Sequence, residues 1–119
     1  MNDSSPDSAA ILAFAEQEVL SGGLKILDRR WQSGDHELDL VAAARGSVLV
    51  AVEVIAAQPG SSYQDFADTG EDRIRQLRTA AVAWMREHGA RYEQIRADVS
   101  GLSPDGTGGF TAGYIEGAG

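Results

Sequence analysis

Two carboxylates that a β-hairpin would bring together, Asp39 and Glu53, are the residues of this chain best suited to chemistry. Opposite residues on two antiparallel strands lie about 5 Å apart at Cβ. Like charges at that separation repel each other, and a divalent cation such as Mg²⁺ or Mn²⁺ is the usual compensation because it binds carboxylate oxygens. Asp39 and Glu53 are therefore candidate metal ligands, although two acids on strands are, taken alone, most often surface residues.

The pattern of the two flanking stretches predicts this hairpin. Valine fills every even position from 48 to 54, which places Glu53 on the opposite strand face. Gly46 lies in the short link between the stretches and can adopt the positive φ of a tight turn. With Gly46 at the apex, Asp39 lies opposite Glu53 and Glu37 lies opposite Ile55. Glu37 is either a third ligand or a group that supports the ligands, and the plainer interpretation is an exposed residue near a strand start.

Further elements are predicted on both sides of the hairpin. A helix begins at Ser5 and Pro6 after a disordered tail at residues 1–4, and it ends at glycines 22 and 23. The remaining expectations are strands over residues 24–31, 36–43 and 48–57, a loop over 58–67, a long helix from a cap at Asp68 or Thr69 to Gly89, a strand around 95–99, a turn over 104–109 and a last strand over 110–115. The long helix carries an apolar stripe of Ile74, Leu77, Ala81, Trp84, Met85 and His88.

Composition limits the class of protein. The 119 residues predict one domain over 1–119, and the absence of cysteine excludes disulfides and thiolate zinc sites. No apolar run is long enough to span a membrane, so a soluble, cytoplasmic protein is expected. The net charge of −8 disfavours tight nucleic-acid binding, which depends on many phosphate contacts. Any nucleic-acid binding is therefore expected to be weak, and no protein partner is indicated.

The same residues resemble those of the small bacterial YraN-like family, predicted endonucleases of the PD-(D/E)XK, or restriction-endonuclease-like, superfamily. The matching segments are residues 23–31, 37–41, 50–55 and 73–81, so the resemblance runs through nearly the whole chain. It implies an α/β fold with an αβββαβ core, a mixed sheet flanked by helices. It also implies that Asp39 and Glu53 correspond to the metal-binding pair of a Mg²⁺- or Mn²⁺-dependent nuclease.

Four departures from the family pattern bear on activity. Ile55 stands where such nucleases carry a lysine that positions or activates the attacking water, and Leu12 stands where the first helix carries a glutamate. His36 replaces a glycine before Glu37, and Arg73 replaces a lysine of the long helix. Arg73 lies at the edge of the apolar stripe and could reach the hairpin, but arginine stays protonated and cannot act as a base.

Three readings of the function follow. The first is a nuclease-fold protein with impaired cleavage and residual binding of a divalent metal and of nucleic acid. The second is an active Mg²⁺-dependent DNA endonuclease in which Arg73 is the relocated basic residue, beside the catalytic pair Asp39 and Glu53. The third is a protein-interaction module that kept only the fold.

Overall fold

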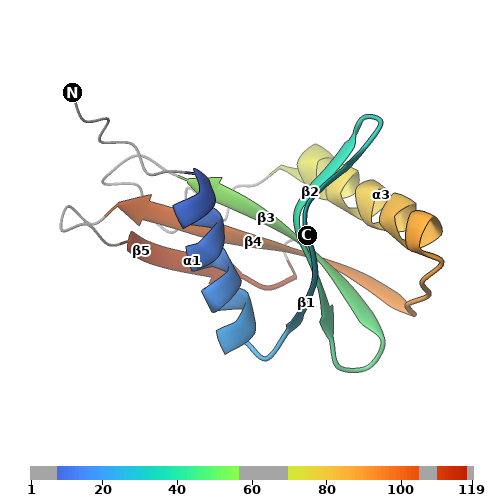
Figure 1. Cartoon of the computed structure of the whole chain (residues 1–119), viewed down its shortest axis with the longest axis horizontal. Helices are drawn as coiled ribbons and strands as arrows, with labels where there is room; N and C mark the ends of the chain where they lie inside the picture. Colours follow the sequence, from blue (N-terminus) through green and yellow to red (C-terminus); the bar gives the residue numbers. More distant parts are fainter. Residues whose placement is uncertain (1–7, 57–69, 105–109, 118–119) are drawn as a thin grey trace.

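The computed structural model describes residues 8–56, 70–104 and 110–117, which form one five-stranded sheet and two helices (Figure 1). In chain order the elements are helix α1 (Ser8–Ser21), strands β1 (Lys25–Ser33), β2 (His36–Ala44) and β3 (Val48–Ala56), helix α3 (Glu71–His88), and strands β4 (Gln94–Pro104) and β5 (Phe110–Ile115). This order agrees with the predicted αβββαβ core followed by a terminal strand. The predicted tail at 1–4, helix start at Ser5 and loop at 58–67 lie outside the described residues.

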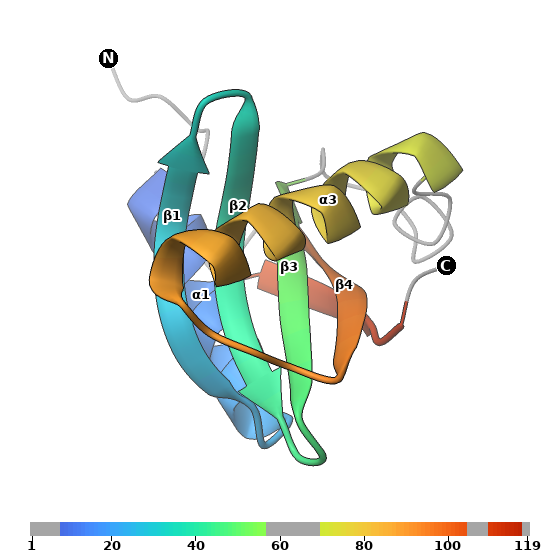
Figure 2. The same ribbon diagram turned by 90° about the vertical axis from the view of Figure 1, so that its right-hand side faces the viewer.

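The sheet is mixed, with the strands in the order β1-β2-β3-β4-β5. Strands β3 and β4 are parallel and the other neighbouring pairs are antiparallel. Helix α3 crosses one face of the sheet, and helix α1 lies on the other face (Figure 2). The predicted fold class, an α/β protein with a mixed sheet flanked by helices, is confirmed, and it is compatible with a restriction-endonuclease-like core.

Alternation along β3 separates two hydrophobic cores. The even residues Val50 and Val52 pack under α1 together with Ala15 and Val19. The odd residues Leu49 and Ala51 pack under α3 with Leu77, Ala81 and both tryptophans, Trp31 and Trp84. Helices cover both faces of the sheet, so β3 is apolar on both sides from residue 48 to residue 52.

The β2–β3 hairpin has the predicted register. Its ladder runs from Ala44 opposite Val48 to Leu40 opposite Val52. Gly46 has φ +83 and Ser47 has φ +62, so both adopt the left-handed conformation in this turn. The backbone amide of Glu93 donates to the Ser47 hydroxyl at 3.1 Å and to its carbonyl at 3.0 Å, which ties the turn to the start of β4.

The boundaries of α3 and β4 differ in part from those predicted. The N-cap of α3 is Gly70, which offers no side-chain cap, rather than Asp68 or Thr69, which lie outside the described residues. Gly89 ends the helix in the left-handed conformation, as predicted. His88 is not part of the buried stripe: its half-exposed ring stacks on Trp84. Strand β4 continues to Pro104, which was predicted to be the first residue of a turn; the rest of that predicted turn, residues 105–109, lies outside the described residues.

Among the described residues, no helix is long and apolar enough to cross a membrane.

Candidate functional site

The candidate carboxylates lie where strand β2 separates from β3. The β2–β3 ladder ends at Leu40 and Val52, one pair before Asp39 and Glu53. Leu40 packs in the α1 core, whereas Leu38, two residues away, packs in the α3 core. The sheet is strongly twisted here, and Figure 1 shows β1 and β2 crossing steeply over the direction of β4 and β5. This twist opens the backbone between the two strands at the level of Asp39.

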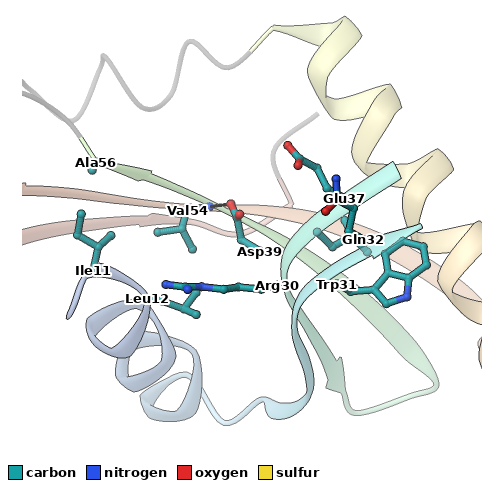
Figure 3. A pocket seen from close by; sticks show the side chains of 10 residues that line it. Ile11, Leu12, Arg30, Trp31, Gln32, Glu37, Asp39, Val54 and Ala56 are labelled. Atoms are coloured by element: carbon teal, nitrogen blue, oxygen red, sulfur yellow. Dashed lines mark hydrogen bonds between the residues drawn. The ribbon is translucent and has the colours of Figure 1, made fainter. Parts of the chain in front are cut away.

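Asp39 uses its carboxylate to replace the missing ladder bond. Its Oδ2 accepts a hydrogen bond from the backbone amide of Val54 at 2.8 Å (Figure 3). Burial raises the pKa of Asp39, and the nearby charges of Glu53 and Glu37 add to this effect. The Val54 amide and the Arg73 guanidinium oppose the rise in this pKa. Asp39 thus lies close enough to Glu53 for the two carboxylates to repel each other.

Glu53 is held by the long helix rather than by β2. The Nε of Arg73 donates to Oε1 at 2.7 Å and to Oε2 at 2.9 Å, and Nη2 lies 2.6 Å from Oε1. The Glu53 side chain is 14% exposed and that of Arg73 is 35% exposed. The hydrogen bond with Glu53 raises the pKa of Arg73 further above its usual value, so the guanidinium is a permanent cation at this position. Arg73 does reach the hairpin, as its place at the stripe edge suggested.

A cavity of about 450 Å³ lies beside Asp39, between α1 and the β1–β2 hairpin (Figure 3). Its walls are Ile11, Leu12, Arg30, Trp31, Gln32, Glu37, Leu38, Asp39, Val54 and Ala56. Leu12, which the family resemblance aligns with a helix glutamate, contributes an alkyl group and no oxygen to this wall. Arg30 extends into the cavity from β1, where its backbone has φ +46.

The other predicted site positions surround this pair. Ile55 is half-buried and, because the β3–β4 ladder is uninterrupted from Val48 to Ala56, it lies on the same strand face as Glu53. Glu37 is exposed and borders the first cavity and a second one, of about 720 Å³, between the hairpin tip and α3. Arg73 also borders that second cavity. The structure therefore gathers Glu37, Asp39, Glu53 and Arg73 around the opening between β2 and β3.

The side chains as they stand do not fit a divalent metal ion. Both carboxylate oxygens of Glu53 accept hydrogen bonds from Arg73, and one oxygen of Asp39 accepts the Val54 amide. Within the described part of the chain, no group of three or more His, Asp and Glu side chains could hold a metal ion. A cation on Glu53 would therefore first have to displace a guanidinium.

Sequence reasoning missed a second buried carboxylate. Asp98 is fully buried in β4 and accepts hydrogen bonds from Nε and Nη2 of Arg96, from the Tyr114 hydroxyl and from the Gly117 amide. Sequence alone carried little signal for it, because Asp98 alternates with Ala97 and Val99 and shares a strand face with Arg96 and Ser100, as an exposed acid would. Its four donors satisfy it completely, which indicates a structural role in fastening β5 and the residues after it to the sheet.

Curated relatives of similar length cover most of this chain. A UPF0102 protein of Arthrobacter sp. (strain FB24) is 32% identical over 83% of each chain. The UPF0102 protein of Renibacterium salmoninarum is 39% identical over 71% of each chain, and that of Rhodococcus jostii (strain RHA1) is 36% identical over 72%. A solved structure, Pyrococcus furiosus SfsA in complex with Ca²⁺, has a TM-score of 0.36 and 16% identity, covering 91% of this chain and 61% of that one. That likeness is too low to bear on the site.

The model of the family described as "Uncharacterised protein family UPF0102" matches residues 13–102, which include helix α3, most of helix α1 and all three strands of the candidate site. This chain therefore belongs to the UPF0102 family, the YraN-like family that its motifs resemble.

Proposed function

We propose that this chain is a nuclease-fold protein whose cleavage is impaired and which binds nucleic acid weakly. The observation that carries the proposal is the surroundings of Glu53, where an arginine fork takes up the carboxylate and Ile55 fills the lysine position. An alkyl group can neither orient a water molecule nor offset the charge that develops on a scissile phosphate. Losing one such electrostatic group typically costs about 10²–10³ in rate.

Weak binding of nucleic acid is supported by the cavity beside Asp39. Arg30 and Gln32 bring hydrogen-bond donors to it, and Ile11 and Leu12 give it an apolar wall, while the carboxylates of Glu37 and Asp39 on the same lining would weaken the binding of a phosphate. The donors and the apolar wall suit a nucleotide, whose phosphate accepts hydrogen bonds and whose base is largely apolar on its faces. The net charge of −8 repels the rest of the nucleic-acid backbone, so affinity should be low and should fall steeply as salt increases.

A combined cleavage and binding assay tests this proposal. The pure protein is incubated with single-stranded, duplex and branched DNA in Mg²⁺ and in Mn²⁺, next to Glu53→Ala as the matched control. The expected result is no metal-dependent cleavage above that of the control, together with salt-sensitive binding by fluorescence anisotropy. Robust cleavage that Glu53→Ala eliminates would overturn the cleavage part, and an absence of binding at low salt would overturn the nucleic-acid part.

The placement of Arg73 favours a second candidate, an active endonuclease with a relocated basic group. Its guanidinium lies within 2.9 Å of both oxygens of Glu53, close enough to stabilise charge at a phosphate bound there. Since arginine cannot accept a proton, the attacking water would need another base. In the same assay, cleavage that disappears in Arg73→Ala would identify this candidate.

A further inference from the structure

We infer that Arg73 is the resident cation of the carboxylate site, so that its guanidinium occupies Glu53 in place of a divalent ion and keeps Mg²⁺ and Mn²⁺ out. The inference rests on the proposed function only in taking Asp39 and Glu53 as the acidic pair of the site. By this inference a divalent ion fits the site poorly because the Arg73 guanidinium already supplies the positive charge that compensates Glu53.

The geometry of the contact between Arg73 and Glu53 is that of a stable ion pair in the place of a metal ion, rather than that of a transient surface ion pair. Arg73 engages Glu53 through two different nitrogen atoms, Nε and Nη2, and reaches both carboxylate oxygens. A planar fork on a carboxylate is the strongest geometry available to an ion pair in proteins. The remaining nitrogen, Nη1, donates to the side chain of Gln76 at 3.1 Å, which holds the guanidinium plane from its other side.

Helix α3 fixes the position of this cation. Arg73 lies in the first turn of α3, directly before Ile74, and Ile74 and Leu77 are buried in the core under the helix. The arginine therefore starts from a backbone that packing holds against the sheet. A tethered guanidinium competes with free metal ions at a high effective concentration, whereas each free ion must also shed bound water before it reaches Glu53.

The competition should be measurable because both cations need the same oxygens. A unit positive charge about 5 Å from a divalent ion lowers its affinity on the order of tenfold even at the dielectric constant of water. Arg73 also removes Glu53 from the set of available ligands, so its loss should raise the affinity for Mn²⁺ by about tenfold or more.

The test is a titration of Mn²⁺ alone, without nucleic acid, into the full chain and its variants, followed by calorimetry and by thermal unfolding. The parent should show no saturable binding at Asp39 and Glu53 and no rise in Tm. Arg73→Ala should bind Mn²⁺ at least tenfold more tightly and gain in Tm on Mn²⁺ addition. The double variant Arg73→Ala with Glu53→Gln should lose both responses.

Arg75→Ala is the matched control. Arg75 lies two residues along the same helix, its side chain is 72% exposed, and it pairs with the exposed Asp72. Its replacement by alanine therefore removes one positive charge from α3 and leaves the hydrogen bonds between Arg73 and Glu53 in place. Arg75→Ala should behave like the parent. A second variant, Arg73→Lys, keeps the charge but not the fork and should bind Mn²⁺ with intermediate affinity, which preserves the test if Arg73→Ala folds poorly.

Two results would overturn the inference: Mn²⁺ binding by the parent as tight as that of Arg73→Ala, or no gain in binding by folded Arg73→Ala and Arg73→Lys. Neither result depends on catalysis. A parent that cleaves DNA would contradict the proposed function, whereas the binding titration judges the resident cation separately.

Discussion

The pair of Glu53 and Arg73 should contribute measurably to folding, and a double-mutant cycle can isolate its contribution. The relevant variants are Glu53→Gln, Arg73→Ala and the two combined. Two unit charges about 4 Å apart interact by about 4 kcal/mol at an effective dielectric constant of 20. Since the Arg73 side chain is 35% exposed, solvent screening reduces this value, and a coupling free energy of about 2 kcal/mol is expected.

The two single variants should differ in cost. Arg73→Ala leaves a carboxylate that is only 14% exposed without its donors, and it should lower the free energy of unfolding by about 2–3 kcal/mol. Glu53→Gln leaves a guanidinium that water can reach, so it should cost less, about 1–2 kcal/mol. Urea unfolding followed by circular dichroism measures all four proteins under one condition.

An additive cycle would refute this reasoning. A coupling free energy below about 0.5 kcal/mol is typical of an exposed surface pair. That result would mean that Arg73 does not hold Glu53 in solution, and an equal cost for the two single variants would contradict the difference in burial.

Three further predictions concern other parts of the fold. Burial raises the pKa of Asp39, so the folded state loses stability as pH rises from 3.8 through that raised pKa. The variant Asp39→Asn can still accept a hydrogen bond from the Val54 amide, and it should be more stable than the parent at pH 7 but not at pH 3. Urea unfolding that showed no such difference between the two pH values would contradict this. Tyr114→Phe removes a donor from the fully buried carboxylate of Asp98 and should cost about 1–2 kcal/mol in chemical denaturation, whereas an unchanged midpoint would exclude a stabilising role for that hydroxyl. Gly89→Ala should cost about 1 kcal/mol in thermal unfolding, since φ is +61 at the end of α3, and an unchanged Tm would argue against the left-handed cap.

Local pattern was sufficient to predict the hairpin that carries Glu53. The alternating valines of β3 determine which residues face each helix, and Gly46, whose positive φ costs a glycine little, marks the turn about which the two strands pair. The place of Arg73 at the edge of an apolar stripe likewise predicted which arginine of the helix could approach the sheet.

The local sequence pattern does not predict the twist of the sheet. Strict alternation would place Leu38 and Leu40 on one face, yet they pack in different cores because β2 leaves β3 after Leu40. The same separation frees the Val54 amide to bind Asp39. Such features depend on how two helices and five strands pack together, which no short window of sequence contains.

The network around Asp98 shows a different limit. Two of its four donors come from Tyr114 and Gly117, which follow Asp98 by 16 and 19 residues. They meet the carboxylate only because β5 pairs with β4. The alternation around Asp98 is typical of an exposed acid, and two of its donors depend on a strand pairing that the sequence pattern did not reveal.

The most direct test of the resident cation is a crystal structure of the unmodified protein grown in millimolar Mn²⁺, with anomalous diffraction data collected near the manganese edge. The expected map shows the Arg73 guanidinium on Glu53, the Asp39 carboxylate on the Val54 amide, and no anomalous peak between the two acids. An anomalous peak coordinated by Asp39 and Glu53, with Arg73 displaced, would contradict the central claim and would restore a metal-dependent nuclease site to this chain.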